Sequence, residues 1–168
     1  LFHEIVALVS QLASQVSVSF TFDDGNVSDL VIGARELTKQ GFVGTFFVLS
    51  SRIGQKGSLS AENIGELHSM GHQIGLHGAD HKDWTQLNDE GRNREFVQAK
   101  KIISDITETS VEHAAIPFGR YNRHVLKTLK EEGYKYVYSS DKGPWRGGQY
   151  PIPRTSLTSD MTLKTVEE

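Results

Sequence analysis

Short apolar runs alternate with amphipathic runs along this 168-residue chain, and this alternation constrains the fold more than any other feature. Segments with helical periodicity or helix-end signals lie at 60–70, 90–106 and 123–132. The second is polar, with a predicted inner stripe of Phe96, Ala99, Ile102, Ile103 and Ile106. The apolar runs have the length of strands and lie at 16–22, 43–49, 73–76, 112–116 and 134–138. A last run, at 150–157, is a candidate for one more strand. Strands that alternate with helices predict βα units, a parallel sheet and right-handed crossovers.

No internal repeat, low-complexity segment or linker divides the chain, so we expect a single domain over residues 1–168. The pattern fits an open doubly wound sheet and a β/α barrel equally well. In both folds the functional residues lie at the carboxyl ends of the strands. Four polar or turn-forming segments follow predicted strands: the acidic pair 23–24, the histidine pair 77 and 81, the segment 117–119, and Asp141.

Two of these segments together predict a metal site. The run 16–22 leads directly into Asp23-Asp24-Gly25, and taken alone this segment is equally an Asx-turn before a helix. His77 and His81 stand four residues apart after the strand at 73–76. Imidazole and carboxylate ligands suit zinc and, less selectively, cobalt, nickel, manganese or iron. The other internal histidines are interpreted as structural (68 and 72) or as surface residues (113 and 124).

Composition excludes several classes of function. The net charge of −3, without a basic run, gives no reason to expect a nucleic-acid partner. No apolar segment reaches membrane-spanning length, and a chain without cysteine has neither a disulfide nor a thiol nucleophile. The apolar segment 5–12 lacks a basic leader and makes a poor signal peptide. Because the chain starts at Leu1, we expect a processed chain or a fragment, and its compartment stays open.

The two clusters resemble the first two motifs of a known family. Thr21-Phe22-Asp23-Asp24-Gly25 is similar to the whole first motif of the polysaccharide deacetylases of carbohydrate esterase family 4, which have the NodB homology fold. His77-Gly78-Ala79-Asp80-His81 is similar to the second motif, with Gly78 where Ser or Thr is usual. The resemblance implies a distorted β/α barrel with parallel strands and outer helices. It covers most of the chain, from 16 to about 156.

Two further segments resemble the later motifs. Pro117-Phe118-Gly119 is similar to the end of the third motif, and Asp141 with Trp145 is similar to the fourth, whose Trp lines the acetyl pocket. By this resemblance the substrate is bound by Pro117, Phe118, Gly119, Tyr121 and Trp145. Tyr121 is also a candidate for stacking on a sugar ring, as is Trp84, although rim and buried aromatic residues are more common.

The resemblance also implies the roles of the two clusters. Asp24, His77 and His81 would hold a divalent metal, with zinc as the first expectation, and Asp23 would be the general base. The chemistry agrees, because a bound metal polarises an amide carbonyl and lowers the pKa of water. A free carboxylate beside the metal can then accept the proton of the water.

Two departures from the family pattern need an explanation. Ala115 stands where the third motif normally begins with an Arg that braces the base, and Arg120 and Arg154 are the candidates to replace it. The closing Leu-x-His motif, which supplies the general acid, is missing from the C-terminal end, but the chain begins with Leu1-Phe2-His3. The biofilm-type deacetylases of poly-β-1,6-N-acetylglucosamine carry this motif first. His3 is therefore the candidate general acid, and a flexible terminal histidine is the alternative.

The sequence thus predicts a metal-dependent N-deacetylase acting on N-acetylglucosamine units of a polysaccharide, in envelope or exopolysaccharide chemistry. The resemblance favours an extracytoplasmic location, although no signal is visible. One alternative is a metal-dependent hydrolase of a small non-sugar amide. Another is an inactive, carbohydrate-binding relative, and a metal-storage or metal-sensing protein is a more distant one.

Overall fold

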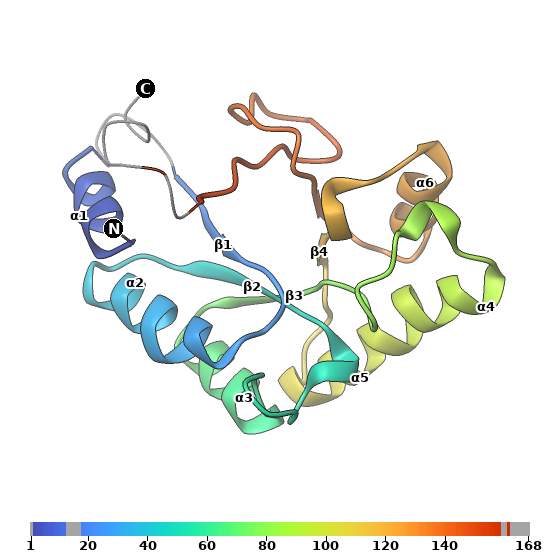
Figure 1. The fold of residues 1–168 in the computed structure, drawn as a ribbon, viewed down its shortest axis with the longest axis horizontal. Coiled ribbons are helices and arrows are strands. Elements are labelled where there is room, and N and C mark those ends of the chain that lie inside the picture. Colours follow the sequence, from blue (N-terminus) through green and yellow to red (C-terminus); the bar gives the residue numbers. More distant parts are fainter. Residues whose placement is uncertain (1, 13–17, 159–160, 162–168) are drawn as a thin grey trace.

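Five parallel strands form the centre of the protein in a computed structural model that describes residues 2–12, 18–158 and 161. Their order in the sheet follows their order in the chain, and the sheet curls into a half-barrel (Figure 1). This is the parallel β/α architecture that the alternation and the family resemblance predict. The strands are β1 (Phe20–Phe22), β2 (Gly44–Val48), β3 (Gln73–Leu76), β4 (His113–Ala115) and β5 (Tyr136–Tyr138).

The helices connect successive strands and pack against the sheet (Figure 1). Two of them contain a π-helical turn, in which the hydrogen bonds span five residues. The elements between β1 and β3 are η1 (Asp29–Ala34, π), α2 (Arg35–Lys39), η2 (Ser50–Arg52, 3₁₀) and α3 (Ala61–Ser69). Those after β3 are η3 (Trp84–Gln86, 3₁₀), α4 (Asp89–Arg92), η4 (Asn93–Gln98, π), α5 (Ala99–Thr107), η5 (Pro117–Gly119, 3₁₀) and α6 (Arg123–Glu131).

Helix α3 confirms the helix predicted at 60–70, and its capping chemistry explains where it begins. Ser60 Oγ accepts a hydrogen bond from the Asn63 backbone N–H at 3.2 Å, and Asn63 Oδ1 accepts one from the Ser60 N–H at 3.1 Å. This reciprocal pair satisfies two donors that the first helical turn leaves without partners. The chain leaves the helix at Gly71, whose φ of 89° is readily adopted only by glycine.

The long helix predicted at 90–106 is also confirmed, as the run α4–η4–α5, but one residue of its predicted inner stripe is wrong. Phe96, Ala99 and Ile103 are buried, whereas Ile102 is 45% exposed. The side chains of neighbouring helical residues point about 100° apart around the helix axis, so Ile102 and Ile103 cannot both point into the core.

The run at 150–157 does not form the strand for which it was a candidate. Only Ile152 bridges β5, where its N–H donates to the Val137 carbonyl at 2.7 Å. Pro151 and Pro153 flank it, and proline has no N–H with which to extend a ladder. The strand predicted at 16–22 is likewise shorter in its described part, where it covers β1 only, and 16–17 lie outside the described residues.

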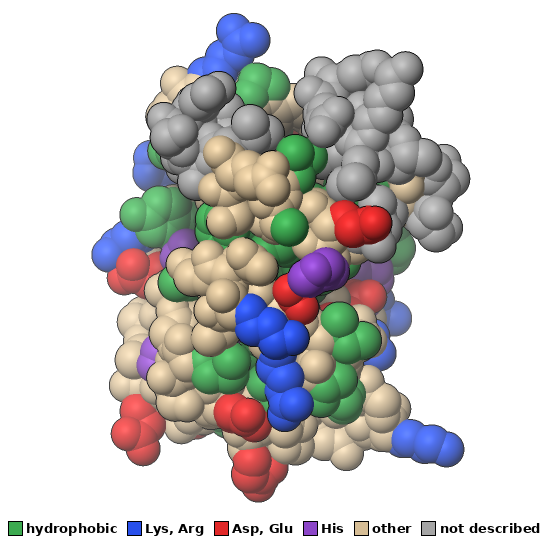
Figure 2. All heavy atoms as spheres, turned by 90° about the vertical axis from the view of Figure 1, so that its left-hand side faces the viewer, with side chains coloured by type: hydrophobic (Ala, Val, Ile, Leu, Met, Phe, Trp, Pro, Cys, Tyr) green, Lys and Arg blue, Asp and Glu red, His purple; other side chains and the backbone are tan. Residues whose placement is uncertain are grey.

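Helix α1 (Phe2–Leu12) covers the beginning of the sheet with a second apolar cluster. Ile5, Val6 and Val9 are buried against Phe20 and Leu37. No helix among the described residues is long and apolar enough to cross a membrane. On the surface seen from the α1 side, basic, acidic and apolar side chains are interspersed, so this face carries charges of both signs (Figure 2).

Two internal histidines take part in the packing. His72 is buried, and its Nδ1 accepts a hydrogen bond from the Gly44 N–H at 3.1 Å, which confirms a structural role. The interpretation of His113 as a surface residue is wrong. Its ring is half-buried, stacks on Tyr136 at 4.6 Å between centroids and lies 3.2 Å from the Tyr138 hydroxyl.

Candidate metal centre

The loop after β1 presents two carboxylates in different directions. Asp24 has a φ of 80° and Gly25 one of 67°, so the backbone turns sharply after Asp23. The Gly25 carbonyl accepts a hydrogen bond from the Leu59 N–H at 2.9 Å, which fixes the turn against the loop that precedes α3. The result is that the Asp24 side chain faces the histidines, whereas the Asp23 side chain also reaches an arginine.

The loop after β3 brings two imidazoles to Asp24. His77 Nδ1 lies 2.9 Å from the Ala115 carbonyl oxygen, an acceptor that leaves Nε2 directed toward Asp24. Asp24 Oδ1 lies 3.6 Å from His77 Nε2 and 3.8 Å from His81 Nε2. A ligand atom of each of these three residues lies within 4.8 Å of the other two. The structure therefore brings the three predicted metal ligands together.

This donor set fits a divalent cation. Two ligand atoms that each lie about 2.1 Å from one ion are roughly 3–3.5 Å apart, and the two separations above are only a few tenths of an ångström wider. His77 is almost fully buried, and burial lowers its pKa, so the ring is neutral and keeps a lone pair for a metal. The backbone acceptor on its other nitrogen fixes the tautomer, as is usual for metal-binding histidines.

Asp23 is paired with Arg154, one of the two arginines that the sequence offered for this role. Arg154 donates two parallel hydrogen bonds to the Asp23 carboxylate, at 2.7 and 2.8 Å. Burial alone would raise the pKa of Asp23, but these hydrogen bonds and the positive charge of Arg154 outweigh it and hold the pKa below the ordinary value of 3.8. Asp23 is therefore an ionised carboxylate of fixed orientation, and its Oδ2 lies 3.9 Å from His77 Nε2.

Arg154 is itself held in place by the inner side of the half-barrel. Its guanidinium lies over the rings of Phe47 and Tyr138, at 5.3 and 5.8 Å from their centroids. It also donates hydrogen bonds to Thr21 Oγ1 and to the Ser139 carbonyl. The other candidate, Arg120, instead contacts Asp83 at 3.2 Å and does not reach Asp23. Of the two arginines, only Arg154 is placed to orient Asp23.

The segment predicted to bind substrate lies beside the histidines. Phe118 has a φ of 59°, is 57% exposed, and places its ring 4.4 Å from that of His81. Pro117 before it is buried, and Gly119 after it has a φ of 64°. Together with Asp24 and His81, Phe118 belongs to the few non-glycine residues with positive φ in the described chain. Such backbone conformations are energetically unfavourable and concentrate at functional sites.

The remaining predicted substrate residues lie on the loops above the sheet. The Tyr121 hydroxyl donates to Asp141 Oδ2 at 2.8 Å, and Ser139 Oγ donates to the same oxygen at 2.7 Å. Trp145 is 59% exposed on the loop that follows β5. The structure does not pack Trp145 against the three candidate ligands. Trp84, the other aromatic candidate for sugar stacking, is buried in the core.

His3 is not brought into this group. Its Nδ1 lies 2.6 Å from Glu36 Oε1, and α1 lies beside α2 (Figure 1). Helix α2 ends the crossover that leads back to the start of β2, so Glu36 lies toward the amino ends of the strands, opposite to Asp23. This geometry contradicts the assignment of His3 as the general acid. Leu1 lies outside the described residues.

Sequence reasoning missed one residue that supports the histidine loop. Glu95 of η4 is 1% exposed, and its carboxylate accepts hydrogen bonds from the N–H groups of Ala79 and Asp80. The only signal in the sequence was Gly78, the position at which the second motif departs from its usual residue.

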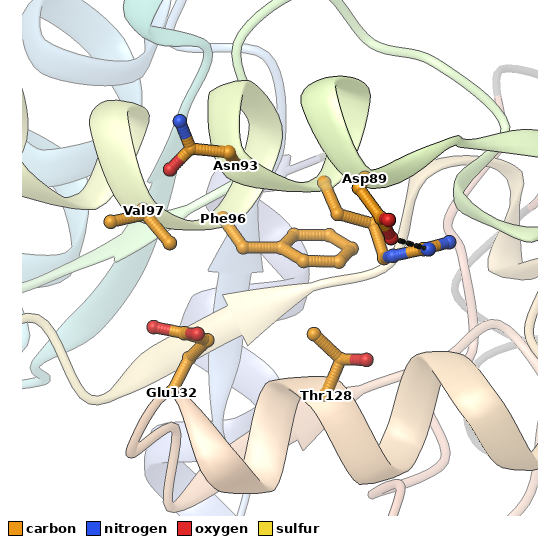
Figure 3. Close-up of a pocket in the computed structure, with 7 residues that line it drawn as sticks. Asp89, Asn93, Phe96, Val97, Thr128 and Glu132 are labelled. Carbon is orange, nitrogen blue, oxygen red and sulfur yellow. Dashed lines mark hydrogen bonds and ion pairs between the residues drawn. The ribbon is translucent and has the colours of Figure 1, made fainter.

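A pocket of about 250 Å³ lies elsewhere, between the α4–η4 run and α6 (Figure 3). None of the candidate metal ligands lines it. Its lining residues are Asp89, Arg92, Asn93, Phe96, Val97, Thr128 and Glu132.

A family model and several curated proteins match this chain. The family model described as polysaccharide deacetylase matches residues 12–137. YxkH of Bacillus subtilis (strain 168) is 27% identical over 151 residues, which cover 89% of this chain and 54% of YxkH. The peptidoglycan-N-acetylglucosamine deacetylase PgdA of Listeria monocytogenes is 29% identical over 113 residues, 67% of this chain and 23% of PgdA. The chain thus spans about half of the one relative and about a quarter of the other.

The fold is shared with solved structures. The Streptococcus pyogenes deacetylase PplD in complex with acetate superimposes with a TM-score of 0.87 over 99% of this chain and 84% of PplD. The two sequences are 18% identical, so the likeness establishes the fold alone.

Proposed function

Because the chain belongs to the polysaccharide deacetylase family, we propose that it is a metal-dependent N-deacetylase that removes acetyl groups from N-acetylglucosamine units of a polysaccharide. The observation that carries this proposal is the grouping of Asp24, His77 and His81 beside a carboxylate that Arg154 orients. PgdA, a relative named as a peptidoglycan-N-acetylglucosamine deacetylase, supports the substrate class. It also favours a place of action at the cell envelope.

The reaction needs a better electrophile and a better nucleophile than an amide and water provide. Asp24, His77 and His81 would hold a divalent cation, with zinc expected ahead of cobalt, nickel, manganese or iron. When bound, this ion would polarise the acetyl carbonyl and make water more acidic. Asp23 accepts the proton as the water oxygen attacks the carbonyl carbon, because Arg154 keeps this carboxylate ionised and aimed.

The leaving nitrogen must gain a proton before the carbon–nitrogen bond breaks. With His3 at the other end of the sheet, Asp23 is the residue of the group that can return the proton it has accepted. A carboxylic acid whose pKa is held low is a strong donor to an amine. The bond between carbon and nitrogen then breaks and the amine leaves. The acetic acid that remains carries the second proton of the water, and it loses this proton and leaves as acetate.

The exposed aromatic residues are proposed to bind the sugar. Phe118, Tyr121 and Trp145 present rings on the loops beside or above the group, and Phe118 contacts His81 directly. Pro117 and Gly119 set the backbone that holds Phe118 in its unusual conformation.

Two alternatives keep the same fold. A hydrolase of a small non-sugar amide would use the same metal group and base. An inactive carbohydrate-binding relative was suggested by Ala115 in place of an arginine and by the uncertain general acid. The contact between Arg154 and Asp23 weakens the first of these arguments.

Acetate release tests the proposal. Protein loaded with zinc is incubated with an N-acetylglucosamine oligomer, and acetate is measured before and after removal of the metal with a chelator. We expect release that the chelator abolishes and that zinc restores. Asp23→Asn is expected to lower kcat by about 10²–10⁴-fold, since it removes the base. Asp105→Asn, on the exposed face of α5, is the matched control.

The outcomes separate the alternatives. Oligomer binding without acetate release from zinc-loaded protein would favour the inactive relative. Hydrolysis of a small amide with no release from the oligomer would favour the other alternative.

A further inference from the structure

A buried carboxylate contacts the loop between the two histidines. Glu95 is 1% exposed, and three donors surround its carboxylate. The N–H groups of Ala79 and Asp80 donate to it at 2.9 and 3.0 Å, and the indole Nε1 of Trp84 donates at 3.3 Å. Hydrogen bonds to an ionised acceptor are roughly twice as strong as those between neutral groups.

The opposite edge of the same loop is held as well. The N–H of Ser50 donates to the Gly78 carbonyl at 3.1 Å, and the N–H of Ser51 donates to the Ala79 carbonyl at 3.2 Å. Residues 78–80 are thus fixed by backbone donors on one edge and by the Glu95 carboxylate on the other. These residues separate the two histidines, so what fixes them also fixes the distance between the imidazoles.

Gly78 is the steric partner of Glu95. A Cβ atom at position 78 would lie 2.2 Å from Glu95 Oε2, which is far inside the contact distance, and the φ of Gly78 is 93°. Only glycine leaves room for the carboxylate and adopts this backbone conformation without strain. Glycine at position 78, where the family usually has Ser or Thr, therefore leaves the space that the buried Glu95 carboxylate occupies.

The π-helical turn explains how one helix serves both the loop and the core. Glu95 and Phe96 are consecutive in η4 and both are buried. Phe96 packs edge-to-face on Trp84, with ring centroids 4.8 Å apart, and closes the floor of the pocket in Figure 3. Short π-helical turns inside α-helices are frequent at functional sites, where they redirect individual side chains.

We infer that Glu95 is a positioning residue for the metal centre, which holds His77 and His81 at the separation that a divalent cation requires. The inference deepens the proposed function and rests on it. The hydrogen bonds that the structure gives Glu95 come from Ala79, Asp80 and Trp84, and none of these is a proposed ligand. Glu95 acts through the backbone N–H groups of Ala79 and Asp80, and its negative charge beneath the loop adds to the attraction for a cation.

Zinc affinity of the Glu95→Gln protein tests the inference. Glutamine has the same shape but offers one acceptor oxygen and no charge to the three donors. We expect the zinc dissociation constant, measured by competition with a fluorescent chelator, to rise about 10–100-fold, as for other residues that support metal ligands. Glu90→Gln is the matched control, since Glu90 is exposed on the adjoining turn of the same helix, and its dissociation constant should stay within about two-fold of wild type.

Amide hydrogen exchange gives a readout that needs no metal. In metal-free protein the N–H groups of Ala79 and Asp80 should exchange at least about 10-fold faster in Glu95→Gln than in wild type, because their acceptor is weakened. Exchange in β2 and β3 should not change, which separates a local effect from a general loss of stability. Unchanged zinc affinity in folded Glu95→Gln would overturn the inference, whatever the exchange rates of these two N–H groups.

Gly78→Ala provides a second test that leaves the buried carboxylate in the chain. The added methyl group displaces Glu95 from its donors, so zinc affinity should fall by a similar factor. A folded Gly78→Ala protein with wild-type zinc affinity would contradict the inference even if Glu95→Gln failed to fold. Failure of the wild-type protein to bind zinc would overturn the proposed function and the inference together, whereas tight binding by both wild type and Glu95→Gln would overturn only the inference.

Discussion

Replacing Arg154 by Met would test whether this arginine controls the ionisation of the proposed base. Methionine keeps much of the length of the side chain and removes both the charge and the two hydrogen bonds to Asp23. What remains is burial, which raises the pKa of Asp23, against the smaller lowering effects of His77 and His81. We therefore expect the pKa to move from below the ordinary value of 3.8 to above it.

The size of the effect follows from the contact and from its exposure. An opposite charge in direct contact lowers the pKa of a carboxyl by about 1–3 units. The Asp23 side chain is 36% exposed, so solvent screens part of the interaction, and we expect a rise of about 1–2 units. A base that has lost its two-point support is also misplaced, and misplacement of about 1 Å can reduce the rate about 100-fold.

The pH dependence of kcat/KM separates these two contributions. A base acts only when it is ionised, so activity is lost as the pH falls through its pKa, and a higher pKa moves this acid limb to higher pH. For Arg154→Met we expect the limb to move up by about 1–2 pH units and the plateau above it to fall by about 10–100-fold. Arg154→Lys should restore the position of the limb more than the height of the plateau, because lysine keeps the charge but not the bidentate geometry.

Arg120→Met is the comparator, because this second arginine contacts Asp83 instead of Asp23. Its acid limb should stay where it is in wild type. An acid limb that Arg154→Met leaves in place, or that Arg120→Met moves equally far, would refute the assignment of Arg154.

Three other substitutions test separate parts of the structure. Asp24→Asn should weaken zinc binding in a dialysis assay by at least about 100-fold, since it removes a proposed ligand; near wild-type affinity would exclude Asp24 as a ligand. His3→Ala should leave kcat/KM within about two-fold of wild type, because an exposed pair with Glu36 contributes little, and a loss of activity of ten-fold or more would reinstate His3 as the acid. Ser60→Ala should lower the free energy of unfolding in urea by about 1 kcal/mol through loss of the cap with Asn63, and an unchanged midpoint would show that the cap contributes nothing.

Most of the fold could be predicted because burial and periodicity are local properties of the sequence. Strand β2 is buried at every position, and Thr45 is the one polar residue in its apolar run. The ends of α3 were predicted from Ser60 and Gly71, because helix capping involves only residues that are close in the sequence. The π-helical turn in η4 has no such local signature and was not predicted. The buried face of the following α5 was predicted one residue too wide, at Ile102, because neighbouring helical residues point about 100° apart.

The candidate site was predictable only where both residues of a contact belong to recognisable motifs. Asp24, His77 and His81 belong to two such motifs, and the parallel sheet brings them to one edge. The choice between Arg120 and Arg154 depends on a contact over 131 residues, which spacing cannot reveal. The prediction of His3 as the general acid was wrong for a similar reason, because the position of His3 depends on where α1 packs.

Ala115 and Arg154 show how the site and the open sheet depend on each other. At position 115 the backbone carbonyl orients His77, and the small side chain leaves the bracing of Asp23 to another residue. Arg154 supplies this bracing from beyond the family match, which ends at residue 137. It does so because Ile152 pairs with β5, so the guanidinium can bond to Ser139 at the end of β5 and to Thr21 in β1 at the same time.

One side chain therefore links the two edge strands of the half-barrel and holds the base at the position where they come together. In an open sheet each edge strand pairs with a neighbouring strand on one side only, and this link adds a contact between the two edges. The same arginine then orients Asp23 and joins the two edges of the sheet. A change that displaces the segment around Pro151 and Pro153 is expected to disturb both contacts.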